Sequence, residues 1–471
     1  MNAISECWFC PSCGAEFTSI PPGHRLCDDC LGQLESLGCE PTPGAPYGDL
    51  APCPDRDGQM VEVVPIVQPP SLACAGGASR VTAGNVGQAR RLVLIFGGPG
   101  PEHEVGLASA LSVREHLTCR GWTLLEAGVT KDGRWLVGTG ALQMLLGAAD
   151  PMRLPAGLDK AAAELAMGVD STAVRGFGGP PPSEIFAGHR MAFLACHGKW
   201  GQDGSAHRLL DSYGLSSVGC DGTATALCFN KPDTKEVLSD AGLPVARGVT
   251  VTAQEFAANP GAAKDRVRRE LGGGAWFVKP ARSGSSIGVA RVDYPHQFDQ
   301  AVGGALRWDS VALVEEYIPH REFVVGVLGN DRLVLSPPGE CIPVGHLYTY
   351  EEKYRLGNPR FTCPAELDQP TVKHLNKLSV RVYKALGCAV MARMDFFLDA
   401  RDGRLLINEV NSTPGLTQTS VFPKVMAAAG YPYPDLLEEL CRLADSNGPE
   451  ATRPKPLPIP RHRDRGRLGD G

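Results

Sequence analysis

The sequence predicts an α/β fold for the body of the chain, about residues 91–446, because strand-like and helix-like segments alternate there. The first expected strand, 91–96, is a continuous apolar run that ends in a glycine turn. Glu102 follows in the first turn of the next expected helix, where a carboxylate suits the helix dipole. A second apolar strand, 191–196, leads directly into His197. This succession of strand, glycine turn and helix places ligand-binding groups at the carboxyl ends of strands.

Length, charge and composition exclude several classes of protein. The chain has 471 residues, of which 43% are apolar and 21% charged, with a formal net charge of −6. At about 150 residues per domain this suggests roughly three domains. Nucleic-acid binding needs a basic surface, and the longest apolar runs fall far short of the about 18 residues of a membrane helix. We therefore expect a soluble, cytoplasmic protein that binds neither nucleic acid nor membrane, without an N-terminal export signal.

Half of the sixteen cysteines fall within the first 74 residues. They include two C-x-x-C pairs separated by thirteen residues, Cys10 with Cys13 and Cys27 with Cys30. This spacing suits a tetrahedral structural zinc site in which each pair donates two thiolates from a tight turn. We expect a zinc-ribbon-like module over 1–38, with a hairpin loop at 21–23. Unliganded or redox-active cysteines are the alternative, and Cys7 or His24 can replace one ligand.

Two segments are too rich in small residues, proline or charge to form a core. Residues 39–90 abound in Pro, Gly, Ala and Ser, and we expect a linker with at most one strand, near 60–67. The tail, 447–471, carries six basic residues and four prolines between positions 453 and 467. Such a composition predicts disorder.

A loop of small residues follows an apolar strand in the middle of the body. Lys279 ends the strand, and the loop 283–288 consists of serine and glycine apart from Ile287. Small residues let backbone N–H groups approach phosphate oxygens closely, and the hydroxyls add donors. The lysine precedes the loop, so the segment is neither a Gly-x₄-Gly-Lys-Ser/Thr phosphate loop nor a Gly-x-Gly-x-x-Gly turn. An ordinary surface turn is the alternative.

Residues near the C-terminal end of the body predict a metal site. Segments 389–398 and 404–411 are expected to pair as a hairpin. The two-residue period of a strand then places Asp395, Glu409 and Asn411 together on one face. Two carboxylates and an amide oxygen are hard ligands suited to Mg²⁺. A solvent-facing polar strand is the alternative.

Six motifs run through the body in a fixed order. They begin at Gly97, His197, Lys279, Tyr350, Arg393 and Asn408, and they read GGPGPEHEV, HGKWGQDG, KPARSGSSIG, YEEKY, RMD and NEVNSTPG. In this order they resemble the ATP-grasp superfamily, and within it the D-alanine–D-alanine ligases and their D-alanine–D-lactate and D-alanine–D-serine relatives. The resemblance covers about three quarters of the chain. It implies α/β and α+β architecture: a substrate domain (91–228), then the central (229–316) and C-terminal catalytic (317–446) parts of an ATP-grasp fold.

The resemblance also implies a reaction. ATP phosphorylates the carboxylate of one D-amino acid, and the amine of a second attacks the acyl phosphate. Phosphoryl transfer depends mainly on neutralising charge, so the expected cofactors besides ATP are two Mg²⁺ or Mn²⁺ ions, held by the acidic hairpin described above. The matching phosphate-binding residues are Lys231, Lys279, Ser285 and Ser286. Arg393 matches the arginine that steadies the acyl phosphate and the tetrahedral intermediate.

Further positions match the nucleotide and substrate contacts of the family. Glu315 matches the residue at the adenine amino edge, the backbone of Glu316–Ile318 matches the part that reads the base, and Glu322 matches the residue at the ribose. Glu316 departs from the lysine that the dipeptide ligases often carry, and this departure bears on ATP affinity.

For the substrates, Glu102 matches the carboxylate that binds the first ammonium, in a trio with Ser285 and Tyr354. His197 matches a histidine near the first substrate, and Gln202 stands where a glutamate is usual. The remaining matches, around the second carboxylate and in the catalytic set, are Lys353, Ser420, Val421 and Gly415. Tyr354 resembles the dipeptide-forming members, which favours an amine over a hydroxyl nucleophile.

Three functions are therefore compared. The first is a D-alanine–D-alanine ligase for peptidoglycan precursors, with small-molecule substrates and a homodimer allowed. The second is a related amino-acid or peptide ligase of secondary metabolism, which the zinc ribbon favours somewhat because it can present a substrate or dock a carrier or protein partner. The third is a non-catalytic ATP-binding scaffold, against which the full set of phosphate and metal residues argues. We take the first as the working prediction.

Overall fold

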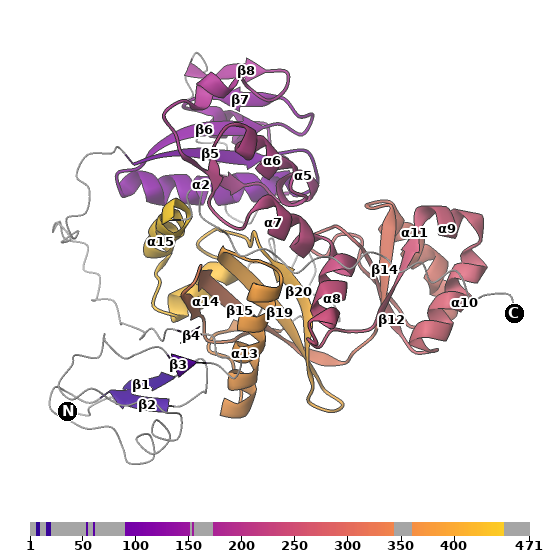
Figure 1. Cartoon of the computed structure of the whole chain (residues 1–471). Helices are drawn as coiled ribbons and strands as arrows, with labels where there is room; N and C mark the ends of the chain where they lie inside the picture. Colours follow the sequence, from indigo (N-terminus) through magenta and orange to yellow (C-terminus); the bar gives the residue numbers. More distant parts are fainter. Residues whose placement is uncertain are drawn as a thin grey trace, which may run out of the picture.

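The computed structural model describes residues 90–150, 153–154, 173–342 and 360–446, together with four short N-terminal strands (Figure 1). These strands form two antiparallel pairs: β1 (Glu6–Phe9) with β2 (Glu16–Ser19), and β3 (Cys53–Pro54) with β4 (Met60–Val61). The connection between β1 and β2 spans 10–15, the stretch that carries the first C-x-x-C pair, whereas the hairpin loop expected at 21–23 lies outside the described residues. The segment 39–90 holds two strands rather than at most one, because the extended residues near 60 find a partner at Cys53–Pro54.

The first sheet has six strands in the order β10-β9-β5-β6-β7-β8. Their bounds are β5 (Arg91–Gly97), β6 (Thr123–Val129), β7 (Trp135–Val137), β8 (Arg175–Phe177), β9 (Met191–Ala195) and β10 (Ser216–Ser217). β5 lies parallel to both β6 and β9. Parallel strands are buried on both faces, which agrees with the continuous apolar runs of β5 and β9. Both strands expected from the sequence are confirmed. The helical segments of this part are α2 (His103–Cys119), α3 (Ala141–Gly147), η2 (Ser183–Phe186), α5 (Lys199–Gln202) and α6 (Ser205–Ser212).

The second sheet is smaller and antiparallel, with the order β11-β14-β12-β13. Its strands are β11 (Gly248–Thr252), β12 (Trp276–Pro280), β13 (Ala290–Val292) and β14 (Val311–Glu316). It is accompanied by α9 (Ala253–Ala258), α10 (Pro260–Leu271), η3 (Pro295–Gln297) and α11 (Phe298–Leu306). These elements have a hydrophobic core of their own, in which Trp276 and Phe298 meet edge to face at 5.9 Å.

The third sheet follows the path β18-β17-β15-β19-β20, with β16 paired to β15. Its strands are β15 (His320–Gly329), β16 (Leu333–Leu335), β17 (Gly339–Ile342), β18 (Arg360–Thr362), β19 (Val390–Asp399) and β20 (Leu405–Asn411). The associated helices are α7 (Gly222–Phe229), α8 (Lys231–Asp240), α13 (Gln369–Ala385), α14 (Val421–Ala428) and α15 (Tyr433–Ser446). β19 and β20 pair antiparallel, which confirms the expected hairpin.

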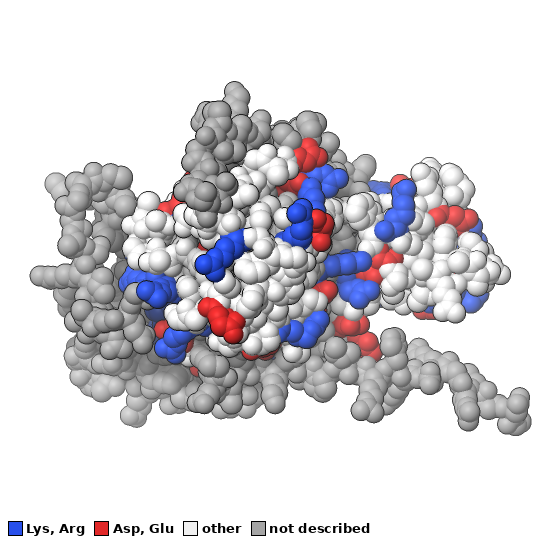
Figure 2. All heavy atoms as spheres, turned by 90° about the horizontal axis from the view of Figure 1, so that it is seen from above, with Lys and Arg blue, Asp and Glu red and all other residues white. Residues whose placement is uncertain are grey.

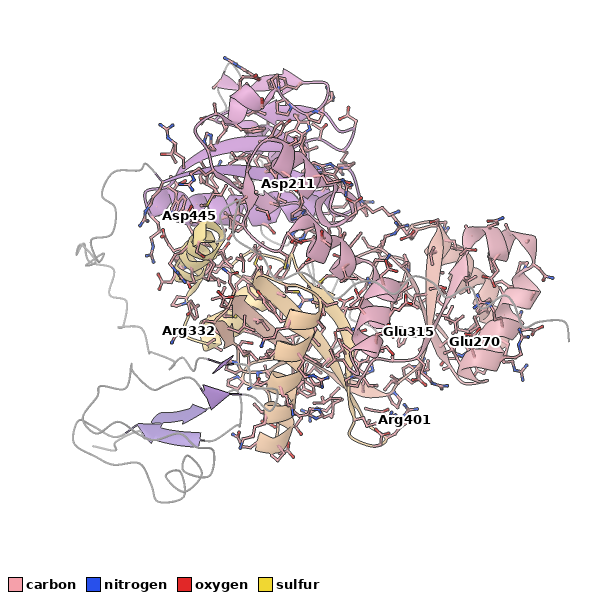
Figure 3. All side chains as sticks on the ribbon, in the orientation of Figure 1. Asp211, Glu270, Glu315, Arg332, Arg401 and Asp445 are labelled. Carbon is pink, nitrogen blue, oxygen red and sulfur yellow. The ribbon has the colours of Figure 1, made fainter. Side chains whose placement is uncertain are left out.

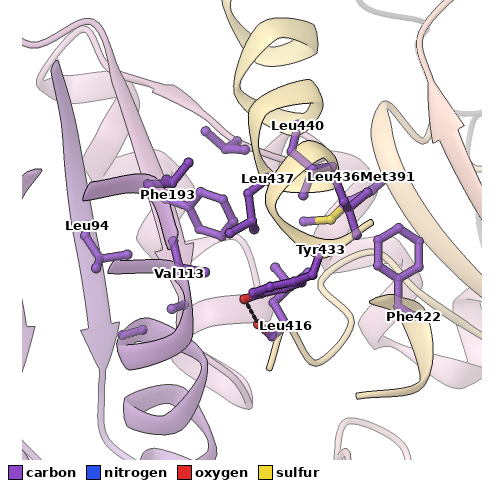
Figure 4. Close-up of a cluster of buried hydrophobic side chains, with 14 of the residues drawn as sticks. Leu94, Val113, Phe193, Met391, Leu416, Phe422, Tyr433, Leu436, Leu437 and Leu440 are labelled. Carbon is purple, nitrogen blue, oxygen red and sulfur yellow. Dashed lines mark hydrogen bonds between the residues drawn. The ribbon is translucent and has the colours of Figure 1, made fainter. Parts of the chain in front are cut away.

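The C-terminal helix α15 packs against α2 of the first sheet's layer (Figures 1 and 4). Leu94 and Phe193 of the first sheet share one hydrophobic cluster with Met391 of the third sheet and Leu437 of α15. At the edge of this contact, Glu438 accepts hydrogen bonds from Arg90, at 3.2 Å, and from the indole of Trp122, at 2.8 Å. The first and third sheets are thus joined by a continuous core.

On the face shown in Figure 2, basic and acidic side chains of the described residues are interspersed rather than gathered into one basic area. Within the described parts of the chain, every helix is too short or too polar to span a lipid bilayer.

Candidate active site

Buried charged side chains meet where β12, β14 and α8 come together. Glu315 on β14 lies opposite Phe277, so Lys279 is its diagonal neighbour on β12, and the two side chains form an ion pair. Glu315 is also 2.6 Å from Lys235 Nζ of α8, and Figure 3 shows it near that helix. The Lys279 ammonium reaches the third sheet as well, because it donates to Asn408 Oδ1 at 3.4 Å.

Burial and the neighbouring charges together set the pKa values of Glu315 and the lysines around it. Burial alone would raise the pKa of Glu315, but the ammonium groups of Lys235 and Lys279 outweigh it and hold the pKa below its usual value. Burial lowers the pKa of both Lys231 and Lys235. Lys235 of α8 and Lys279 of β12 therefore share the single ionised carboxylate of Glu315. Such a surplus of cationic groups suits phosphate oxygens.

The loop between β12 and β13 turns sharply at its serines. Ser285 and Ser286 have φ of 53° and 59°, a region that residues other than glycine rarely adopt. Successive backbone N–H groups in a turn can converge on an anion. At the base of the loop, Arg282 Nε and its second guanidinium nitrogen donate to the two oxygens of Asp309, at 2.9 and 2.7 Å. Lys231 Nζ donates to the carbonyl of Ser283 at 2.5 Å, which ties α8 to the same loop.

The carboxylate of Glu102 lies against this loop. Ser285 Oγ donates to Glu102 Oε1 at 2.6 Å. A Cβ at Gly284 would lie 2.7 Å from the same oxygen, and a Cβ at Gly198 would lie 3.1 Å from Oε2. A side chain at 284 would therefore displace the Glu102 carboxylate from this position. The structure thus brings together Glu102 and Ser285, two members of the expected trio, while Tyr354 and the neighbouring Lys353 lie outside the described residues.

His197 and Gln202 shape the turn beside Glu102. His197 Nε2 forms a hydrogen bond with Ser109 Oγ at 3.4 Å, and burial lowers the pKa of the imidazole to about 4. The ring is therefore neutral at pH 7. Gln202 Oε1 accepts from the backbone N–H of Gly198 at 3.0 Å. The amide oxygen of Gln202 accepts this hydrogen bond as a glutamate oxygen would. Glutamine in place of the usual glutamate therefore preserves the turn and removes only a negative charge.

The β19–β20 hairpin brings the expected metal ligands together. Asp395 lies opposite Glu409, and Arg393 lies opposite Asn411. Arg393 donates to both oxygens of Asp395 at 2.7 Å, and Asn411 Nδ2 donates to the same carboxylate at 3.3 Å. Although burial opposes it, the Asp395 charge raises the pKa of Arg393 above its usual value. Lys231 Nζ is 3.8 Å from Glu409 Oε2, which connects the hairpin to the phosphate loop through α8.

The donor set of the hairpin fits a hard cation. Asp395 and Glu409 carry carboxylate oxygens, and Asn411 carries an amide whose nitrogen faces Asp395 and whose oxygen is the expected third ligand. In the described part of the chain, no cluster of three or more His, Cys, Asp or Glu side chains is arranged to hold a metal ion. Two carboxylates are nevertheless enough for Mg²⁺ where nucleotide phosphates and waters complete its shell. The four zinc-ligand candidates, Cys10, Cys13, Cys27 and Cys30, lie outside the described residues.

At the expected adenine hinge, Glu316 has a partner that the sequence did not suggest. Arg247, just before β11, donates to Glu316 Oε2 from Nε at 3.2 Å and from its guanidinium NH₂ at 2.9 Å. The negative charge that replaces the usual lysine is therefore compensated. Ile318 is buried beyond the end of β14, and Glu322 lies on β15 opposite Cys341. Tyr317 of the hinge packs under the Arg291 guanidinium at 4.0 Å.

The remaining predicted residues lie at the start of α14. Ser420 precedes this helix and accepts from the Thr417 N–H at 3.2 Å. A Cβ at Gly415 would lie 3.1 Å from Ser420 Oγ, so these two predicted residues are neighbours. Val421 begins α14 and packs against the core shared by the first and third sheets.

Sequence reasoning missed three side chains that position the site: Lys235, Arg247 and Asp309. Lys235 had a signal, since it is four residues after Lys231 and so lies on the same face of α8. Arg247 and Asp309 are far in sequence from the residues they hold, and no local pattern marks them.

Comparisons with known proteins agree with this geometry. The family model described as "D-ala D-ala ligase N-terminus" matches residues 91–220, and "D-ala D-ala ligase C-terminus" matches 237–442. The protein named D-alanine–D-alanine ligase from Pelodictyon phaeoclathratiforme is 35% identical over 355 residues, covering 75% of this chain and 97% of that relative. Its namesake from Chlorobium luteolum is 36% identical over 354 residues, covering 75% and 96%.

Solved structures show the same likeness. The VanG D-Ala:D-Ser ligase from Enterococcus faecalis superimposes with a TM-score of 0.63 and 29% identity, covering 76% of this chain and all of that one. The D-alanine-D-alanine ligase from Coxiella burnetii gives a TM-score of 0.60 and 26% identity, covering 76% and 96%.

Proposed function

The chain belongs to the D-alanine–D-alanine ligase family, and we propose that the site described above binds ATP and joins two D-alanine molecules. It is an ATP-dependent carboxylate–amine ligase with the ATP-grasp fold, and its products are D-alanyl-D-alanine, ADP and phosphate. One contact supports the assignment of the site most directly. The hydrogen bond from Ser285 to Glu102, at 2.6 Å, places the carboxylate suited to an amino-acid ammonium beside the loop suited to phosphate.

The chain's own residues explain how the reaction would be held. Lys231 and Lys279 bind phosphate oxygens, and the serine loop closes over them. Glu102 fixes the ammonium of the first substrate, while the neutral His197 adds no charge beside it. Arg393 stabilises the negative charge that develops on the transferred phosphoryl group and on the tetrahedral intermediate. Magnesium held by Asp395, Glu409 and Asn411 would neutralise phosphate charge.

The relatives favour this function over a ligase of secondary metabolism. The two curated relatives quoted above are both named D-alanine–D-alanine ligase and match three quarters of the chain, whereas one of the solved structures is a D-Ala:D-Ser ligase. We propose a role in supplying a peptidoglycan precursor. A cytoplasmic location agrees with the use of ATP and with the eight free thiols among the described cysteines. A homodimer, and docking of a carrier or protein partner by the N-terminal module, are part of this proposal.

The second substrate should be an amino acid rather than a hydroxy acid. We expect D-alanine to exceed D-lactate by at least tenfold in kcat/KM near pH 8, where tenfold corresponds to about 1.4 kcal/mol of transition-state binding. The amine must lose its proton before it attacks, so the preference should grow as the pH rises. ATP-dependent phosphate release with each acceptor from pH 6 to 9 measures this, with products identified by mass spectrometry.

A panel of D- and L-amino acids, including D-serine, provides the comparison for this assay. Tyr354→Phe should lower dipeptide synthesis and leave the KM for ATP unchanged, because Lys279 and the hinge lie elsewhere in the sequence. Equal or faster ester formation with D-lactate across the whole pH range would contradict the amine-acceptor assignment.

The N-terminal module should carry a structural zinc ion. We propose Cys10, Cys13, Cys27 and Cys30 as its ligands; the pairing of β1 with β2, which puts the first two cysteines in the connection, supports this. About one zinc ion per chain should copurify, as measured by elemental analysis. Cys27→Ser should lower the zinc content, whereas Cys119→Ser, which changes an exposed free thiol of α2, should not. Full zinc retention in Cys27→Ser would rule out the assignment.

A chain that begins at Arg90 serves as the second control. It should contain no zinc and keep its ligase activity, because every described site residue lies downstream. Arg90 is retained because it donates to Glu438 of α15. Loss of activity in this truncated chain would show that the N-terminal module takes part in the site.

A further inference from the structure

Lys235 lies one helical turn after Lys231 on α8, and the reaction proposed above gives it no role. Its side chain is buried, with 9% of the residue exposed, and its ammonium is 2.6 Å from Glu315 Oε1. Glu315 is more deeply buried, at 3% exposed, and its other oxygen pairs with Lys279. Two ammonium groups therefore hold the two oxygens of one buried carboxylate.

The two lysines differ in what else they can reach. Lys279 sits at the end of β12, directly before the phosphate loop, and also donates to Asn408 at 3.4 Å. Lys235 lies within α8, and its ion pair is with Glu315. A nucleotide phosphate at the loop would compete with Glu315 for the Lys279 ammonium. Leaving a buried carboxylate without a cation is costly, because the interior does not solvate the charge.

We propose that Lys235 is a positioning residue that compensates Glu315, so that Lys279 can give its ammonium to the phosphates of ATP. The proposal rests on the proposed function and deepens it, since it explains how a lysine paired in a buried ion pair becomes available to the nucleotide. The low pKa of Glu315 agrees with a carboxylate that stays ionised and needs a permanent partner. Lys235 does not touch the nucleotide; it acts through Glu315.

ADP binding by isothermal titration calorimetry, without any amino acid, tests the idea independently of the product the enzyme makes. In Lys235→Met, Lys279 must serve both Glu315 and phosphate, so ADP should bind about tenfold more weakly. Adenosine has no phosphate to draw Lys279 away from Glu315, so the carboxylate assigned to the adenine amino edge keeps one ammonium, and adenosine should lose less than about threefold in a competition assay. In turnover, the KM for ATP should rise while kcat at saturating ATP changes by less than about threefold. Equal losses for ADP and adenosine would overturn the proposal, because a purely structural defect weakens both.

A second pair of variants keeps the test valid if Lys235→Met folds poorly. In the Glu315→Gln background no carboxylate needs compensation, so adding Lys235→Met should change ADP affinity by less than about threefold. An additional tenfold loss in that background would overturn the proposal.

Two further variants are matched controls. Lys235→Arg restores a cation beside Glu315 and should bring ADP affinity back to within about threefold of the parent protein. Lys264→Met removes a lysine of α10 that pairs with Asp299 at 3.7 Å, and it should leave ADP binding unchanged. Failure of arginine to recover the affinity of Lys235→Met would also count against a role through charge.

Discussion

Replacing Glu409 by glutamine should lower kcat by about a thousandfold, because one of the two carboxylates of the proposed magnesium site loses its charge. Glu409 lies opposite Asp395 on the β19–β20 hairpin and 3.8 Å from Lys231 Nζ. Glutamine has the same shape, so the hairpin should remain paired. The loss therefore reports on the electrostatics of phosphoryl transfer rather than on folding. Phosphate release at saturating ATP and D-alanine, measured over a series of Mg²⁺ concentrations, gives the value.

Glu439→Gln is the matched control for this variant. Glu439 is an acidic residue of α15 whose carboxylate pairs with Arg442 of the same helix. It should lower kcat by less than about twofold, as most surface ion pairs contribute little. Thermal unfolding of both variants should resemble that of the parent protein. Near-normal turnover of Glu409→Gln at saturating Mg²⁺ would remove Glu409 from the metal site.

The parts of the site that lie on one hairpin or one strand and its loop could be predicted from the sequence. Asp395 and Glu409 lie on strands joined by a short turn, so the period of two fixes which side chains share a face. Lys279 and the serine loop are likewise consecutive in sequence. In both cases local geometry determines which side chains lie together. The order of the motifs, through the family resemblance, then predicts which ligand each group binds.

Contacts between distant segments had no such signal. Lys235 and Glu315 are 80 positions apart and meet only because α8 packs beside the second sheet. The Arg247–Glu316 pair depends on the pairing of β11 with β14, and that register is set by the whole sheet.

Backbone strain could not be predicted from the sequence either. Val390, the first residue of β19, has φ of 65°, which is unfavourable for a β-branched side chain. Its N–H donates to Asn330 Oδ1 at 3.0 Å, and the residue is fully buried. Such a conformation costs on the order of 1–3 kcal/mol and persists only where surrounding contacts determine it. The start of the strand that carries Arg393 and Asp395 is thus held in an unfavourable conformation by contacts from a distant segment.

Arg393→Lys should lower kcat by about a hundredfold while leaving the KM for ATP within about threefold of the parent value. Arg393 donates to both oxygens of Asp395 at 2.7 Å, and a lysine ammonium cannot reproduce that planar fork. The positive charge remains, so binding of ATP through Lys231 and Lys279 should survive. What is lost is the fixed orientation of the cation toward the reacting phosphoryl group. Steady-state kinetics with ATP and D-alanine varied separately distinguish these effects.

The β19–β20 hairpin contains a second arginine–aspartate pair, which serves as a control. Arg401 likewise forms a two-point ion pair with an aspartate two positions away in the sequence. It donates to Asp399 Oδ1 from Nε at 2.9 Å and to Asp399 Oδ2 from its NH₂ group at 2.6 Å. That pair lies at the turn between β19 and β20, and no site residue is in it. Arg401→Lys loses an equivalent fork, so any cost of the fork to the hairpin itself should appear in both variants. If Arg401→Lys keeps full kcat while Arg393→Lys loses about a hundredfold, the effect belongs to the position of Arg393 beside the reacting group. Equal losses in the two variants would instead assign the arginine to the stability of the hairpin.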